Sequence, residues 1–197
     1  MNHKPWQADI SNHISNLSTD DSDLKILFRA LSFAANKHKH QRRRDADASP
    51  YINHPISLAA ILCNEAHVTD VETLCGALLH DTVEDTETTA EELEQAFGES
   101  ICAIVMEVTD DKSLSKAERK QAQIDHAANI SEKSKLVKLA DKISNLRDVL
   151  HNPPPDWNLE RRQQYFDWAQ CVIEQVRGTH PTLEALFDET YAKRPEI

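Results

Sequence analysis

The chain has 197 residues, which is long enough for one domain with a substantial core and short for two. Its net charge of −11 argues against a protein that coats nucleic acid, because such proteins carry an overall basic face, but it leaves room for a small anionic substrate at a local cationic patch. Only three glycines occur, which excludes clustered-glycine phosphate loops and the many tight turns of a sandwich or barrel.

The cysteines and apolar runs indicate a compartment. No zinc-binding spacing occurs among the cysteines, which are far apart in the sequence, and we expect them to be buried, reduced thiols. The N-terminal region lacks the apolar core of a signal peptide, and no apolar run is long enough to span a bilayer. We therefore expect a cytoplasmic protein with neither membrane nor nucleic-acid partners, whose oligomeric state the sequence leaves unknown. The four cysteines are Cys63, Cys75, Cys102 and Cys171.

The N-terminal part contains an extension and a first helix. Residues 1–22 are polar and are predicted to be an extension, with one short amphipathic helix possible over residues 10–17, whereas residues 23–197 are predicted to form the domain. Apolar residues then recur at helical spacing over 24–40, which predicts the first helix. Two histidines at its end are expected to be exposed, where they favour the helix dipole: His38 and His40.

A polar loop and two helices follow. Residues 42–50 are polar and are predicted to form the loop, after which Pro55 suits the first turn of a second helix. Thr69 and Glu72 have the spacing of a capping box, which predicts the start of a third helix. The apolar face of that helix leads directly into His80.

The rest of the chain also predicts helices. Capping boxes begin at Thr89 and Ser115, a long amphipathic pattern covers 134–150, and two C-terminal helices stop at Gly178 and start near Pro181. No alternating strand pattern and no internal repeat is found. The sequence therefore predicts an all-α, single-domain helical bundle of about eight to ten helices.

An adjacent histidine and aspartate are the strongest indication of chemistry. His80 and Asp81 close the third predicted helix, and Glu84 and Asp85 follow one turn later. If that helix continues, all four side chains share one face. Imidazole and carboxylate groups are the ligands that hold catalytic divalent metals, so this pattern predicts a metal site with acid and base groups beside it.

Two further residues complete a candidate metal site. His54 precedes Pro55 at a rigid helix start, and Asp141 is a single acidic residue on an otherwise apolar helical face. A buried lone carboxylate is costly unless it is paired or binds a metal. Together with His80 and Asp81 these residues make a set of two histidines and two aspartates, which suits Mn²⁺ or Fe²⁺ better than Mg²⁺.

These residues carry a resemblance to a known family. The order of His54, His80-Asp81 and Asp141 resembles the HD superfamily of metal-dependent phosphohydrolases. The neighbouring segments resemble the hydrolase domain of RelA/SpoT proteins, and among these the stand-alone Mesh-type small alarmone hydrolases, over roughly residues 24–190. No synthetase domain follows, so we expect degradation alone. The matching segments are residues 42–44, 50–55, 80–86, 108–112 and 135–147.

The resemblance implies an activity and roles for individual residues. It implies an all-helical Mn²⁺-dependent hydrolase, with one ion per chain, that removes the ribose 3′-diphosphate of guanosine tetra- and pentaphosphate, (p)ppGpp, as pyrophosphate and leaves GDP or GTP. It places His54, His80, Asp81 and Asp141 at the metal and makes Glu84 and Asp85 the catalytic acidic pair. Substrate contacts are then expected from Arg43 on the guanine, Arg44 and Lys142 on phosphate, Tyr51 in the nucleotide pocket and Asn145 on the sugar.

Some alternatives stay open. The loop over 43–51 is longer and more acidic than the usual family loop and lacks its glycine, so another phosphorylated nucleotide, such as NADPH with its 2′-phosphate, is a second candidate substrate. A third hypothesis is a non-catalytic helical module in which the metal only stabilises the fold. The presence of Glu84 and Asp85 argues against it, because such a module needs metal ligands but no acid and base groups. The aromatic cluster of Trp157, Tyr165, Phe166 and Trp168 is predicted to be packing rather than a base-stacking platform, because no basic stripe interleaves it.

Overall fold

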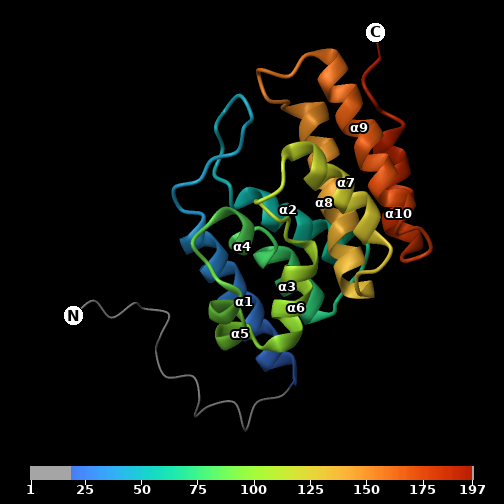
Figure 1. Ribbon diagram of the computed structural model, residues 1–197. Helices are drawn as coiled ribbons and strands as arrows, with labels where there is room; N and C mark the ends of the chain where they lie inside the picture. The colour runs from blue at the N-terminus through green and yellow to red at the C-terminus, as the bar shows by residue number, and fades with distance from the viewer. Residues whose placement is uncertain (1–18, 197) are drawn as a thin grey trace.

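The computed structural model describes residues 19–196, which fold into a helical bundle (Figure 1). No strand occurs within this part of the chain, where a single isolated bridge pairs Arg42 with Pro50. The all-α prediction is confirmed. The helices, in chain order, are α1 (Thr19–Lys37), α2 (Asn53–Ala60), the π-helical turn η2 (Ile61–Glu65), α3 (Val71–Leu79), α4 (Thr82–Asp85), α5 (Ala90–Phe97), α6 (Glu99–Val108), α7 (Lys116–Ala127), α8 (Glu132–His151), α9 (Leu159–Glu174) and α10 (Pro181–Tyr191).

The helix starts follow the capping chemistry of the sequence, with one correction. Ser115 caps α7 with the complete reciprocal capping box, and the Thr89 side chain accepts the hydrogen bond of the third residue of α5. The prediction that Thr69 caps α3 is wrong. Asp70 is the cap, because its carboxylate accepts hydrogen bonds from both the amide and the hydroxyl group of Thr73.

The structure also defines the limits of the first and third helices. The first helix begins at Thr19, before the predicted start at Leu24, and the short helix predicted over residues 10–17 lies outside the described part of the chain. The third helix closes at the His-Asp pair, as the sequence indicates, and does not continue to Glu84 and Asp85. His80 is the C-terminal cap of α3, and Asp81 is the N-terminal cap of the separate single turn α4.

Two apolar clusters form the core, and α3 lies between them. One cluster joins α1, α5 and α6, and the other joins α2, α8, α9 and α10, while residues of α3 contribute to both. Close packing at Gly76 of α3 is required here, because a Cβ atom at this position would lie 2.5 Å from Ile104 Cγ2 on α6. The end of α3, where His80 lies, is therefore fixed from both sides.

The segment between α1 and α2 folds back towards α4, which corrects one prediction. His38 was expected to be exposed but is 2% exposed, and its ring packs against Tyr51 with 4.8 Å between ring centroids. His40 is exposed, as expected. The bridge between Arg42 and Pro50 closes the loop, and this closure brings Tyr51 back beside the end of α1.

Among the described residues, no helix is long and apolar enough to cross a membrane.

Candidate metal and phosphate site

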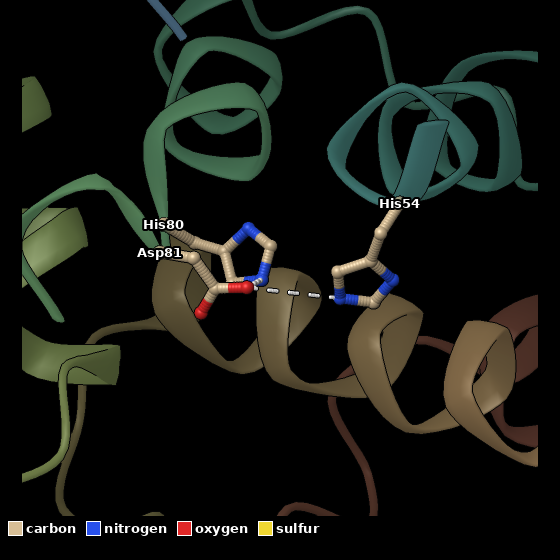
Figure 2. A group of neighbouring side chains, drawn as sticks. All are labelled: His54, His80 and Asp81. Atoms are coloured by element: carbon tan, nitrogen blue, oxygen red, sulfur yellow. Dashed lines mark ion pairs between the residues drawn. The ribbon is translucent and has the colours of Figure 1, made fainter. Parts of the chain in front are cut away.

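Four helices bring the predicted metal ligands to one place. His54 lies in the first turn of α2, His80 ends α3, Asp81 precedes α4, and Asp141 lies in the middle of α8. Figure 2 shows His80 and Asp81 pointing towards His54 across the face of α8. Residues that are up to 87 positions apart in the sequence therefore converge, as the sequence predicts.

The donor atoms of these residues are within reach of a single ion. One ligand atom from each of His54, His80 and Asp81 lies within 4.8 Å of the other two. His54 Nε2 is 3.9 Å from Asp81 Oδ2 and 3.3 Å from Asp141 Oδ1, and His80 Nε2 is 2.9 Å from Asp81 Oδ2. A cation among these atoms would replace the close contacts between them by bonds to itself.

Backbone and hydroxyl groups orient both imidazole rings. His80 Nδ1 donates a hydrogen bond to the carbonyl oxygen of Ala77 at 2.8 Å, and His54 Nδ1 lies 3.3 Å from Ser144 Oγ. Each of these contacts leaves the Nε2 atom for the central position. Histidine ligands of metals are held in this way by a partner on the other ring nitrogen.

The electrostatics separate the two histidines. Burial lowers the pKa of His54, so its imidazole is neutral near pH 7. Burial disfavours charge on His80, but the negative charges of Asp81 and Asp141 together with the hydrogen bonds of the ring outweigh it and raise the pKa of His80 to about 9. Burial likewise opposes ionisation of Asp81 and Asp141, yet both carboxyl pKa values are lowered, at Asp81 by His80 with His54 and at Asp141 by Lys142 with the two histidines.

The residues present fit a divalent ion of the Mn²⁺ or Fe²⁺ type. The set combines two imidazole nitrogens with two ionised carboxylates, which is the mixed nitrogen and oxygen donor chemistry that these ions take. His80 Nε2 is buried and makes no well-aligned hydrogen bond within the described residues, which is the state expected of a ligand atom. His54, His80, Asp81 and Asp141 are the residues that would hold the ion.

Two acidic side chains of α4 lie beside this set. Glu84 accepts a hydrogen bond from the Asp110 amide at 3.1 Å, and burial, with the nearby carboxylates, raises its pKa to about 7. Asp85 accepts hydrogen bonds from Lys112 Nζ at 2.6 Å and from Gln41 Nε2 at 2.9 Å. A carboxylate whose pKa is close to neutrality can both accept and return a proton at physiological pH.

Four of the predicted substrate residues line the same cavity, whose volume is about 290 Å³: Arg43, Tyr51, Lys142 and Asn145. The Arg43 guanidinium lies over the Tyr51 ring, 5.6 Å from its centroid, and contacts Asn145 Oδ1 at 3.2 Å. Asn145 and Lys142 each donate to one oxygen of Asp141, at 2.6 and 3.0 Å. The Tyr51 hydroxyl donates to Asp81.

Arg44 lies apart from the other predicted substrate residues. Its side chain is 69% exposed, contacts Asp156 Oδ2 at 3.4 Å and is not among the residues that line the cavity. Arg147, on the metal-facing helix α8, pairs with Glu65 through two hydrogen bonds of 2.7 and 2.9 Å. This arginine is therefore a structural link between α8 and η2.

The cavity also contains residues that the sequence analysis missed. One wall is the cationic face of α7, and another carries aromatic rings of α9. Lys120 Nζ lies 4.6 Å and Lys142 Nζ 4.4 Å from the centroid of Trp168, and Arg161 lies over Trp157. The expectation that no basic residues interleave this aromatic cluster is therefore wrong, because the fold places basic side chains against its rings. The missed lining residues include Lys116, Arg119, Lys120 and Gln123, and Tyr165 and Trp168, which were predicted to be packing residues, line the cavity as well.

Comparisons with known proteins identify the family. Residues 30–166 match the family described as HD domain. A zebrafish (Danio rerio) protein named guanosine-3′,5′-bis(diphosphate) 3′-pyrophosphohydrolase MESH1 is 50% identical over 173 residues, which cover 88% of this chain and 96% of that protein. The chain belongs to the HD-domain family and, within it, to the Mesh-type group. The human MESH1 protein is 49% identical over 88% of this chain and 97% of its own length.

Other HD-domain relatives extend this assignment. A solved structure described as a metazoan ortholog of SpoT that hydrolyzes ppGpp superposes with a TM-score of 0.84 at 46% identity, over 93% of this chain and 99% of that one. A Brucella melitensis protein named GTP pyrophosphokinase rsh is 39% identical over 135 residues, 66% of this chain but 18% of that protein. This chain thus matches nearly the whole length of the Mesh-type relatives and a small part of the larger enzyme.

Proposed function

We propose that this chain is a metal-dependent pyrophosphohydrolase that removes the 3′-diphosphate of (p)ppGpp as pyrophosphate, with Mn²⁺ as its ion. The observation that carries the proposal is the cavity itself, where the donor set of His54, His80, Asp81 and Asp141 meets the acidic pair of α4 and the cationic wall of α7. The names of the MESH1 relatives and of the superposed structure agree with this substrate.

The ion supplies two things when it is bound: it offsets the charge of the phosphoryl oxygens and makes a water molecule more acidic. The protein then has to move a proton. Glu84, with a pKa of about 7, takes the proton of the attacking water as a general base. Asp85, one residue further along α4, orients that water. Both roles need carboxylates fixed beside the donor set rather than within it, and α4 provides this arrangement.

The diphosphate group of the substrate needs positive charge that the metal alone does not provide. Lys116, Arg119 and Lys120 line the cavity on successive turns of α7, and Lys142 reaches it from α8. Ammonium and guanidinium donors bind phosphate oxygens through short charge-assisted hydrogen bonds. We assign these four residues to the transferred diphosphate and to the 5′-phosphates of the nucleotide.

The nucleoside has a different environment. Arg43 over Tyr51 forms a flat cationic surface on which a purine can stack, and Asn145 beside it offers an amide to the ribose. Tyr165 and Trp168 extend the aromatic wall. This combination supports a purine nucleotide, and guanine is assigned from the named substrate of the relatives.

A cytoplasmic location is part of the proposal. All four cysteines are free in the structure, two of them exposed rather than buried as expected, and free thiols agree with a reducing compartment.

A competition assay tests the substrate. Purified protein with Mn²⁺ is offered guanosine tetraphosphate together with NADPH and other phosphorylated nucleotides, and the products are separated. We expect pyrophosphate and GDP to form first. Release of inorganic phosphate from NADPH in preference would contradict the proposed substrate while leaving the reaction class intact.

A further inference from the structure

The Asp85 carboxylate is held from two directions by residues outside α4. Gln41 Nε2 donates to Asp85 Oδ2 at 2.9 Å, and Lys112 Nζ donates to Asp85 Oδ1 at 2.6 Å. Gln41 comes from the turn after α1, and Lys112 comes from the loop after α6. Since α4 is a single turn that ends at Asp85, the helix alone does not fix the direction of this side chain.

A buried histidine stands behind Gln41. His38 Nδ1 lies 2.6 Å from Gln41 Oε1, and the His38 side chain is almost completely buried. The chain of contacts fixes its own polarity, because the Asp85 carboxylate only accepts hydrogen bonds. Gln41 must therefore turn its NH₂ group to Asp85 and its oxygen to the histidine, and His38 Nδ1 must carry the proton.

The same histidine also packs against Tyr51, a residue that borders the metal-donor set. Its ring is tilted against the Tyr51 ring at an interplanar angle of 32°, and the Tyr51 hydroxyl donates to Asp81. His38 thus contacts Gln41, which donates to Asp85, and also Tyr51, which donates to Asp81. The remaining nitrogen, His38 Nε2, is buried and makes no hydrogen bond within the described residues.

We infer that His38 and Gln41 are positioning residues for the reaction: they fix the direction in which Asp85 presents its carboxylate to the attacking water. This inference rests on the proposed function, because Asp85 orients water only if the site hydrolyses a phosphate. Neither residue is among those that line the cavity. Their effect passes through the Gln41 amide to Asp85.

A merely structural role makes different predictions. If His38 only filled the core and Gln41 only stabilised the turn after α1, their substitution would lower stability and leave the turnover of the folded protein unchanged. A positioning role instead lowers kcat while substrate affinity and metal affinity stay the same, because the binding groups are separate residues. The separation of kcat from KM and from thermal stability is therefore the decisive readout.

The first experiment uses Gln41→Leu in the full chain, with His40→Asn on the exposed side of the same turn as the control. Partners that orient a site group typically contribute about 10–100-fold, so we expect kcat for guanosine tetraphosphate to fall at least about tenfold in Gln41→Leu, with KM and Mn²⁺ affinity unchanged. The control keeps the wild-type kcat. A Gln41→Leu enzyme with wild-type kcat would overturn the inference.

A second set of variants tests the link through His38. Asparagine places an NH₂ group where the histidine Nδ1 lies, so His38→Asn retains the donor to Gln41, whereas His38→Leu removes it. We expect His38→Asn to recover most of the turnover that His38→Leu loses. Because both residues act along one path, the double variant His38→Leu/Gln41→Leu should be no slower than the slower single variant. Additive losses would overturn the link.

A measurement that needs no turnover separates this inference from the proposed function. In wild-type protein with ¹⁵N-labelled histidine, NMR should show the His38 Nδ1 atom carrying a proton, and this signal should change in Gln41→Leu. An unprotonated Nδ1 would overturn the inference even if the enzyme is active. A wild-type enzyme that releases no pyrophosphate would overturn the proposed function and leave this test of the hydrogen-bond chain valid.

Discussion

Binding of Mn²⁺ should displace one proton, and that proton should come from His80. In the metal-free protein the attraction of Asp81, 2.9 Å away, raises the pKa of His80 to about 9, so its imidazole is charged at neutral pH. A histidine binds a metal only through its neutral imidazole. His54, whose pKa is lowered by burial, is already neutral, and the two aspartates are already ionised, so none of them adds a proton to the count.

The magnitude follows from the pKa of His80. At pH 8 a group with a pKa of about 9 is about nine-tenths protonated, so about 0.9 proton should leave per ion bound. Below pH 9 the apparent affinity should rise about tenfold per pH unit, which is about 1.4 kcal/mol of binding free energy per unit. Above pH 9 the affinity should level off, because His80 is then neutral before the ion arrives.

Calorimetry in two buffers of different ionisation enthalpy counts the protons directly. The measurement at pH 8 isolates His80, because Glu84, with a pKa of about 7, is then about nine-tenths ionised. The variant Glu84→Gln serves as the control and should release the same number of protons. Binding at pH 8 without proton release, together with a flat affinity from pH 7 to 9, would refute this account of His80.

The other predictions concern catalysis, substrate binding and packing. Glu84→Gln should bind Mn²⁺ normally while kcat falls by about 10²–10⁴-fold, and a wild-type rate would remove Glu84 from the chemistry. In the wild type, kcat should decline as pH falls below about 7, since the base must be ionised, and a pH profile of Glu84→Gln should lack this limb. Lys120→Met should raise KM roughly tenfold in steady-state assays, because it removes one charged contact to phosphate; an unchanged KM would place the phosphates elsewhere. Gly76→Ala should lower the free energy of unfolding by about 1–2 kcal/mol in urea titrations, because the clash with Ile104 exceeds the gain in helix propensity of about 1 kcal/mol, and a stabilised variant would contradict the packing described for α3.

Local rules explain why most helices could be predicted. The periodicity over 134–150 produced α8 (Glu132–His151), and the Ser115 capping box began α7, because both signals act within one or two turns. The failures lie where tertiary contacts decide. Asp70 rather than Thr69 caps α3, and its carboxylate is also held by Lys133 from α8 at 3.0 Å, a contact that no local pattern contains.

The candidate site divides in the same way. The metal donors could be predicted because residue type restricts their chemistry: imidazoles and carboxylates on apolar faces need a partner. The cationic wall of α7 could not be predicted, because a lysine on a polar helix is normally solvated, and only the fold places Lys120 against Trp168. The burial of His38 depends on closure of the loop by Arg42 and Pro50, which the polar composition of the loop does not reveal.

The central claim is that one ion, held by His54, His80, Asp81 and Asp141, is needed to release pyrophosphate. The most direct measurement titrates Mn²⁺ into metal-stripped protein and follows pyrophosphate release from guanosine tetraphosphate alongside the bound metal. We predict that the rate rises in proportion to the metal bound, saturates at one ion per chain and disappears with chelator. Undiminished pyrophosphate release from protein that contains no metal would contradict the account.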